Sequence, residues 1–416
     1  MAGPLAGIRV LDLTSVVSGP LATMFLADQD AEVIKIEPPG GSPARQIGPF
    51  YKDQPHPDRS LYWWAYNRNK RSITLDIERD EGRALLRRLV ERADFLLESH
   101  NPGYLPARNL GFSDLAKTNP ALIYVSITPF GQDGPKANYA DSDLIIMAAG
   151  GPLILAGDED RPPVRLPIPQ AYLHASADAA VAALAAHHER TGSGLGQHVD
   201  VAAEQSVGMA TQSHILAAPL GSPEVRRVSG GVKVAGIDIP LVWPAKDGFV
   251  AMTFLFGSAL GVFTAKLMRF VCEQGFCDQA TRDKDWIAFG EQLFSGAEPL
   301  SEFERIKELV RNFTRNYTKA ELLDLAVERG FLITPVTTIA EVVESPQFAS
   351  RDYFQRVAHP ELGESFLYPG PFAKFSATPL EYRLRPPTVG EHNSVIYREL
   401  GLSERDLAEL SHAGII

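Results

Sequence analysis

The chain has 416 residues, of which 45% are hydrophobic, and a formal net charge of −11 at pH 7. A chain of this length is expected to form about two domains of roughly 150 residues each. The negative charge argues against nucleic acid as a partner, because binding it requires a positive field. No apolar run approaches the ~20 residues of a membrane-spanning helix, and no signal peptide precedes Leu5, so we expect a cytoplasmic protein without a membrane partner.

The first 41 residues predict a strand, a helix and a second strand. Residues 8–13 and 32–36 are short apolar runs, and Leu21, Met24 and Phe25 between them have helical spacing. A βαβ unit of this kind makes a parallel strand pair and places a loop where α/β sheets bind ligands. The first turn contains no GxGxxG sequence, so the dinucleotide-binding fingerprint is absent.

The alternation of strands and helices continues to about residue 220. Further strands are predicted at 72–77, 94–98, 121–128 and 198–201, and helices at 80–93 and 176–189.

From Gly221 the composition changes, after which a second, smaller domain of mixed α and β structure is expected. It follows a Gly-rich joint at 229–231 and contains charged helices at 301–316 and 319–328. The tail at 369–387 is predicted to be extended and the segment 404–413 to be a final helix.

The two cysteines, Cys272 and Cys277, lack a second ligand pair for zinc, so we expect free buried thiols in a reducing compartment and no metal site.

Several segments, in order along the chain, resemble class III coenzyme A transferases. They are residues 5–41, 67–76 (NRNKRSITLD), 98–103 (ESHNPG), 126–135 (SITPFGQDGP), 189–201 (ERTGSGLGQHVDV), 369–379 (PGPFAKFSATP) and 390–403 (GEHNSVIYRELGLS). The resemblance implies an α/β fold with a Rossmann-like large domain formed by residues 1–220 and 341–416. A small α+β domain of residues 221–340 is inserted into it, and two chains thread through each other as interlocked rings.

The resemblance also implies a binding site for coenzyme A (CoA), whose phosphates require cations and backbone donors. Residues that match positions around the family's CoA site are Lys35, Pro38, Arg45, Asn69, Lys70, Arg71, Ser99 and Arg108, with Thr128 where formyl-CoA transferase has a lysine. Lysines and arginines in a turn such as 69–72 can also be merely solvated. CoA or an acyl-CoA is then a substrate, and no covalently bound cofactor is expected.

The catalytic residue of the family is an aspartate that attacks the acyl-CoA thioester. Counted back from Arg190, its position falls on Ala171, or on Tyr172 after a one-residue shift, and neither side chain can form an acyl anhydride. The racemase branch of the family needs a histidine near Asp141, and none stands there.

Three hypotheses follow from the missing aspartate. The chain is the non-catalytic subunit of a heteromeric transferase, whose homologous partner subunit carries the aspartate. Here the segment 169–175 resembles a subunit of the transferases for aromatic succinates. Alternatively, the chain is self-sufficient and uses another group, such as Asp178, or direct attack by the acceptor carboxylate. In the third hypothesis it binds CoA without turnover.

The acceptor acid is not identified by the sequence. Five aromatic side chains could line an acceptor pocket or belong to the core, namely Phe130, Tyr172, Trp243, Phe254 and Phe256.

Overall fold

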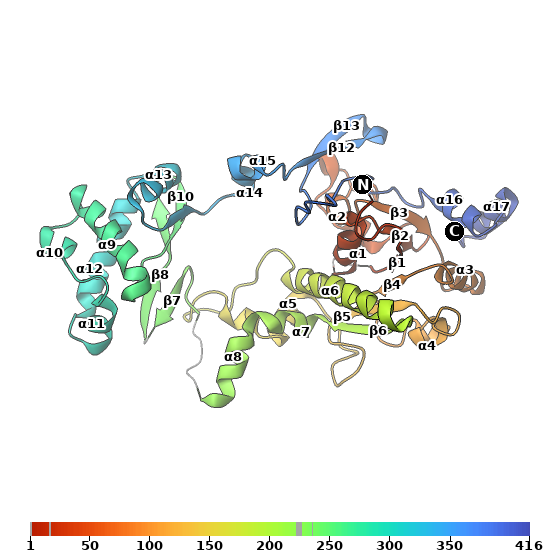
Figure 1. The fold of residues 1–416 in the computed structure, drawn as a ribbon, viewed down its shortest axis with the longest axis horizontal. Coiled ribbons are helices and arrows are strands. Elements are labelled where there is room, and N and C mark those ends of the chain that lie inside the picture. Colours follow the sequence, from red (N-terminus) through yellow and green to blue (C-terminus); the bar gives the residue numbers. More distant parts are fainter. Residues whose placement is uncertain (1, 16–17, 222–226, 235) are drawn as a thin grey trace. The chain divides into compact units, whose positions relative to one another are not determined.

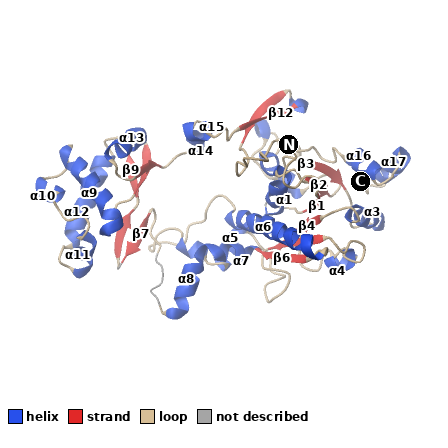
Figure 2. Ribbon diagram, in the orientation of Figure 1, coloured by secondary structure: helices blue, strands red, loops and turns tan. Residues whose placement is uncertain are grey.

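The computed structural model describes residues 2–15, 18–221, 227–234 and 236–416, and the chain divides into two compact units (Figures 1 and 2). Unit 1 contains Met1–Leu153, Arg165–Ala217 and Pro346–Ile416, and unit 2 contains Ile154–Val164 and Ala218–Ser345. Each unit is described separately below.

A six-stranded parallel sheet in the order β3-β2-β1-β4-β5-β6 forms the centre of unit 1. Its strands are β1 (Arg9–Leu13), β2 (Glu32–Glu37), β3 (Lys70–Thr74), β4 (Phe95–Glu98), β5 (Ile123–Thr128) and β6 (His198–Ala202). This is the strand order of the Rossmann fold, in which the direction of winding reverses between β1 and β4. Ligands of such sheets bind at that point, outside the carboxyl ends of the strands.

Helices cover both faces of the sheet (Figure 1). On one face, α1 (Ser18–Asp28) and α6 (Gln170–Ser193) pack against apolar side chains of β1, β2, β4 and β5. On the other face lie α3 (Asp80–Val90), α16 (Asn393–Glu399) and α17 (Glu404–His412). The remaining elements of the unit are α2 (Leu61–Tyr66), α4 (Phe112–Leu115), α5 (Asp143–Ala149), α7 (Ala203–Gly208), α8 (Gln212–Ala217), α15 (Pro346–Ser350) and the hairpin of β12 (Gln355–His359) and β13 (Glu364–Tyr368).

Small side chains on α6 allow this helix to approach α1 closely. The alanines at 171, 175, 179 and 183 recur every four residues and are fully buried in the same core cluster. The helix ends at Gly194, which adopts a left-handed conformation with φ 74° and donates its N–H to the carbonyl of Arg190.

The carboxyl-terminal segment completes the edge of the sheet at β3. The Asn393 side chain accepts the Thr74 N–H at 2.8 Å, and the Tyr397 hydroxyl donates to the Thr74 carbonyl at 2.6 Å. Residues more than 300 positions apart in the chain therefore join a helix to the sheet within unit 1.

Polar side chains inside the sheet are bonded to one another across three strands. Asp12 on β1 accepts hydrogen bonds from Lys35 on β2 at 2.9 Å and Lys70 on β3 at 3.1 Å, and all three side chains are fully buried. Although burial alone would raise the pKa of Asp12, the two ammonium charges hold it below its ordinary value. Burial lowers the pKa of Lys70 to about 8, against the opposing charge of Asp12.

Unit 2 combines short antiparallel strands with a helical cluster around one aromatic core. Its elements are β7 (Gly231–Val234), β8 (Ile237–Pro240), β9 (Val242–Ala245), β10 (Gly248–Met252), β11 (Ile333–Pro335), α9 (Gly257–Glu273), α10 (Gln279–Arg282), α11 (Phe289–Ser295), α12 (Leu300–Thr314), α13 (Lys319–Arg329) and α14 (Ile339–Val343). Trp243 and Phe254 are buried in this core and Phe256 packs against it, so these aromatic residues have a structural role.

The two cysteines differ from the expectation of free thiols. Cys272 at the end of α9 and Cys277 after the following turn form a disulfide, with their Cα atoms 4.5 Å apart. Disulfides persist mainly in oxidising compartments. The cysteines therefore no longer support the expectation of a reducing compartment.

Across the described parts of the chain, no helix has the length and apolar character needed to cross a membrane.

Candidate functional site

A cavity of about 310 Å³ opens at the carboxyl ends of β1 to β4 in unit 1. Its lining consists of Leu13, Thr14, Ser15, Ile36, Glu37, Pro38, Ser42, Pro43, Leu75, Asp76, Ile77, Glu78, His100 and Tyr104. Because β1 and β4 flank the point where the winding of the sheet reverses, this cavity occupies the position at which α/β sheets bind ligands. We call it the switch-point cavity.

One wall of the switch-point cavity is aromatic. The rings of His100 and Tyr104 stack with centroids 4.4 Å apart, and the guanidinium of Arg108 lies 3.7 Å from the centre of the Tyr104 ring. Burial, followed by the positive charges of Lys35 and Arg108, lowers the pKa of His100 to about 4, so its ring is neutral at pH 7. Arg108 also pairs with Glu78 at 2.8 Å. The wall therefore offers a flat ring surface with a cation behind it.

The opposite wall is held in place by buried ion pairs. Arg45 bonds to both oxygens of Glu37, at 2.7 and 2.8 Å, and its guanidinium lies 3.7 Å from the centre of the Trp63 ring. Glu37 also accepts the Ser42 N–H at 2.8 Å. These contacts fix the loop after β2, which places Pro38 in the lining of the cavity.

The residues suggested by the CoA resemblance do not all reach the cavity. Pro38 lines it, Arg108 touches two lining residues, and the Ser99 hydroxyl accepts the N–H of Ser15, a lining residue, at 3.0 Å. Lys35, Lys70 and Arg45 are fully buried and bonded within the sheet and its loops.

Three further residues of that set are engaged elsewhere in unit 1. Asn69 has φ 61° and bonds to Asp28 and to the carbonyl of Glu381, both at 2.9 Å. Arg71 pairs with Glu32 at 2.8 Å, and the Thr128 hydroxyl accepts the Gly131 N–H at 3.0 Å. Sequence reasoning missed His100, Tyr104 and Glu78, although the motif at 98–103 contains the first of them.

Ala171 and Tyr172, to which the sequence count assigns the position of the family aspartate, lie in the first turn of α6. Ala171 is fully buried in the core, and its N–H donates to Asp143 at 2.8 Å. Tyr172 is half-buried and its hydroxyl donates to Asp141 at 2.7 Å. Burial, reinforced by Asp141, raises the pKa of Tyr172, which therefore stays protonated. The carboxylates in contact with this turn come from the start of α5 and the loop before it, which the sequence did not predict.

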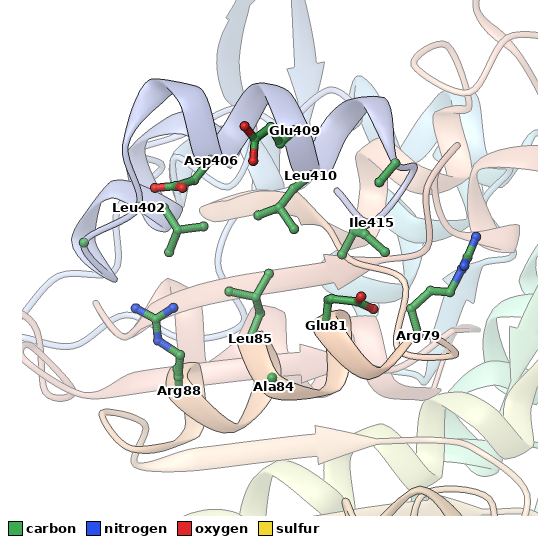
Figure 3. Close-up of a pocket in the computed structure, with 12 residues that line it drawn as sticks. Arg79, Glu81, Ala84, Leu85, Arg88, Leu402, Asp406, Glu409, Leu410 and Ile415 are labelled. Carbon is green, nitrogen blue, oxygen red and sulfur yellow. The ribbon is translucent and has the colours of Figure 1, made fainter.

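Another hollow, of about 670 Å³, lies between α3 and α17 and shares no lining residue with the switch-point cavity (Figure 3). Leu85, Leu402 and Leu410 face each other across it, with charged side chains such as Arg88 and Asp406 around them. Its larger volume does not make it the better candidate, because no strand end reaches it. Within the described ranges, no three His, Cys, Asp or Glu side chains form a group that could hold a metal ion.

Comparisons with known proteins agree with the fold. The profile of CoA-transferase family III matches residues 5–393. The chain is 33% identical to the succinyl-CoA:(R)-benzylsuccinate CoA-transferase subunit BbsE of Thauera aromatica, covering 100% of this chain and 99% of that protein. It is 34% identical to the succinyl-CoA–D-citramalate CoA-transferase of Chloroflexus aurantiacus, covering 99% and 98%.

Solved structures show the same similarity over nearly the whole length of the chain. A CaiB/BaiF family protein from Brucella suis superposes with a TM-score of 0.81 at 27% identity, covering 96% of this chain and 100% of that one. The match of sequence and fold over nearly the whole length is decisive: the chain belongs to CoA-transferase family III.

Proposed function

We propose that the chain is the non-catalytic subunit of a heteromeric transferase that moves CoA from an acyl-CoA, such as succinyl-CoA, to an organic acid. The acceptor we favour is an aromatic dicarboxylic acid, because BbsE is named as a subunit of an enzyme for (R)-benzylsuccinate. A homologous subunit supplies the nucleophilic aspartate.

The observation that carries this proposal is the first turn of α6. Covalent catalysis in the family needs a carboxylate that attacks the thioester carbon, forming an acyl anhydride and releasing the CoA thiolate. The side chain of Ala171 faces the core, and the half-buried Tyr172 presents a protonated phenol. Neither group can take up an acyl group in that step.

The switch-point cavity is the proposed site for CoA in this chain. The stacked rings of His100 and Tyr104 suit an adenine base. Pro38 lines the cavity and Arg108 and Ser99 contact lining residues, so in this proposal these three positions hold the phosphates. The other residues of the predicted set, Lys35, Arg45, Asn69, Lys70, Arg71 and Thr128, act in this proposal by fixing the strands and loops around the cavity. The burial and hydrogen bonds of most of them support this indirect role.

The proposed assembly is an interlocked pair of homologous chains. Its large domain contains residues 1–220 and 341–416 and its small domain residues 221–340, a layout supported by the two compact units. The bonds of Thr74 with Asn393 and Tyr397, which join the two ends of the chain within unit 1, also support it.

The test is CoA transfer by the purified chain, alone and after co-expression with a homologue that carries the aspartate. The chain alone should transfer no CoA from succinyl-CoA to benzylsuccinate or other carboxylates. The pair should be active, and an Asp→Asn change in the partner should abolish turnover. Mass spectrometry of hydroxylamine-trapped acyl groups should find them on the partner only. Robust transfer by the chain alone would overturn the proposal.

A second candidate function is a self-sufficient transferase that uses Asp141. This carboxylate is exposed and contacts the hydroxyl of Tyr172, so it lies close to the position of the family nucleophile. Here an acyl group should be trapped on Asp141, and Asp141→Asn should abolish activity. The alternative through Asp178, two turns along α6, predicts the same loss in Asp178→Asn. If the chain binds CoA but transfers it neither alone nor with the homologous subunit, the third hypothesis, a CoA-binding protein without turnover, is supported.

A further inference from the structure

A second cavity, of about 240 Å³, lies beside the switch-point cavity in unit 1. Its lining consists of Glu98, Asn101, Gly103, Leu105, Pro106, Gly111, Phe112, Ser113, Tyr124, Ser126, Gln132 and His198. The end of β4 and the segment after it contribute to both cavities, because Glu98 and Asn101 line the second whereas His100 and Tyr104 line the first. Glu98 is therefore only two residues from His100, which lines the switch-point cavity.

Three polar side chains form a continuous chain from the interior to the surface. Glu98 on β4 is buried and hydrogen-bonded to the hydroxyl of Ser126, its neighbour in the register of β5. The Ser126 hydroxyl lies 2.9 Å from Nε2 of His198 on β6, an exposed residue. At its other end, Glu98 Oε2 accepts the backbone N–H of His100 at 2.7 Å.

The surroundings of Glu98 favour its neutral form. Among the described residues, no lysine, arginine or histidine forms an ion pair with it, and the groups facing it are Tyr124 and Ser126 on β5 and His198 and Asp200 on β6. Burial raises the pKa of Glu98 to about 7, with a further contribution from Asp200, against hydrogen bonds from Ser126 and the His100 N–H. Burial also lowers the pKa of His198, which Asp200 opposes.

We propose that Glu98 is a positioning residue for CoA, which fixes the His100–Tyr104 wall of the switch-point cavity and exchanges a proton with solvent through Ser126 and His198. The proposal rests on the proposed use of that cavity for CoA. In the exchange, the His198 imidazolium gives its Nε2 proton to the Ser126 oxygen, and the Ser126 hydroxyl proton passes to Glu98. A neutral imidazole, an unchanged hydroxyl and a neutral carboxyl remain.

The consequence is a cavity wall that responds to pH. A carboxylate accepts the His100 N–H more strongly than a neutral carboxyl does, because charge-assisted hydrogen bonds are the stronger ones. Protonation of Glu98 therefore loosens the wall against which CoA binds. Affinity for CoA should fall as the pH drops through 7.

The experiment is calorimetric titration of the full-length chain with CoA and with 3′-dephospho-CoA between pH 6 and pH 8.5. The unchanged chain should lose affinity about 3- to 10-fold toward the acid end. In Glu98→Gln the dissociation constant should be nearly independent of pH, and Ser126→Ala should shift the midpoint. His214→Gln, which alters an exposed histidine on α8, is the matched control and should behave as the unchanged chain.

Two failures can be told apart. If the unchanged chain binds neither ligand at any pH, the proposed use of the cavity is wrong, and the role of Glu98 is lost with it. If it binds CoA and Glu98→Gln retains the same pH profile, with thermal melting showing that the variant is folded, the role of Glu98 alone is wrong. A pH dependence seen with CoA but absent with 3′-dephospho-CoA would come from the ligand phosphate and would also overturn it.

Discussion

Glu98 is a buried carboxyl group that forms no ion pair with any residue the structure describes, and this makes the stability of unit 1 depend on pH. Its pKa is about 7 in the folded chain, above its ordinary value of 4.5. The unfolded chain therefore releases this proton at lower pH than the folded chain does. The contribution of Glu98 to stability is fully present below about pH 4.5 and is lost as the pH rises to about 7.

We expect Glu98→Gln to remove this loss. In urea denaturation at pH 8, the variant should be more stable than the unchanged chain by about 1–3 kcal/mol, and at pH 5 the difference should shrink. The amide keeps a hydrogen-bond acceptor for the His100 N–H, so the fold should be preserved. An equal difference between the two chains at both pH values would contradict this prediction.

Single residues also show where sequence reasoning stops. Lys35 and Lys70 occur in segments that resemble a CoA site, yet both side chains are fully buried against Asp12. Their partner lies on another strand, and the sequence around each lysine contains no sign of it. Pro38 and Ser99 come close to the cavity because loops after parallel strands meet at one edge of the sheet, which the strand pattern does predict.

At the scale of elements, the three strands β1, β2 and β3 depend on the Asp12 carboxylate. Asp12→Ala would leave two buried ammonium groups without a counter-charge, which typically costs about 3–5 kcal/mol. We therefore expect a large loss of stability in urea denaturation. Arg405→Ala, which breaks an exposed pair with Glu409 on α17, is the control and should have little effect. A small effect of Asp12→Ala would show that the lysines lose their charge or reach solvent.

The start of α6 makes a second prediction at this scale. Ala171→Asp would place a carboxylate in the apolar core between α6 and the sheet, so the variant should lose about 3 kcal/mol or more. Tyr172 is half-buried and packs against this core only in part, so Tyr172→Asp should cost less stability and remain folded, especially together with Asp141→Asn, which removes a facing charge. Thermal melting separates the two variants. Equal stability of both would mean that Ala171 does not face the core.

The same helix illustrates how elements are misjudged from sequence. Its predicted start was residue 176, whereas α6 begins at Gln170, directly after Pro169. The alanine-rich run that predicts the helix does not extend to its first turn, which is stabilised by Asp143 from a distant segment. The strand expected at 72–77 is β3 at Lys70–Thr74, because the buried lysine made its true start look polar. By contrast, the apolar strands β1, β2, β4 and β5 lie within two residues of their predicted positions.

At the scale of the whole molecule, we expect the chain to form a dimer, with itself or with its homologous partner. The described surface of unit 1 carries exposed apolar side chains on α5 and on α8, among them Leu144, Ile145, Ile215 and Leu216. Surfaces of this kind mark protein interfaces. In sedimentation experiments at micromolar concentration the chain should be dimeric. A compact monomer, alone and with the partner, would contradict the interlocked assembly.

The bonds of Asn393 and Tyr397 with Thr74 also have a consequence for biosynthesis. A nascent chain emerges from the ribosome with β3 complete but with the helix that covers it still unmade, and all of unit 2 is translated in between. Because synthesis adds about 5–20 residues per second, the apolar face around β3 stays exposed for many seconds before α16 is made. Chaperone binding should therefore concentrate on nascent chains of intermediate length, and ribosome-bound chains arrested before residue 393 should be more sensitive to protease near β3 than released ones.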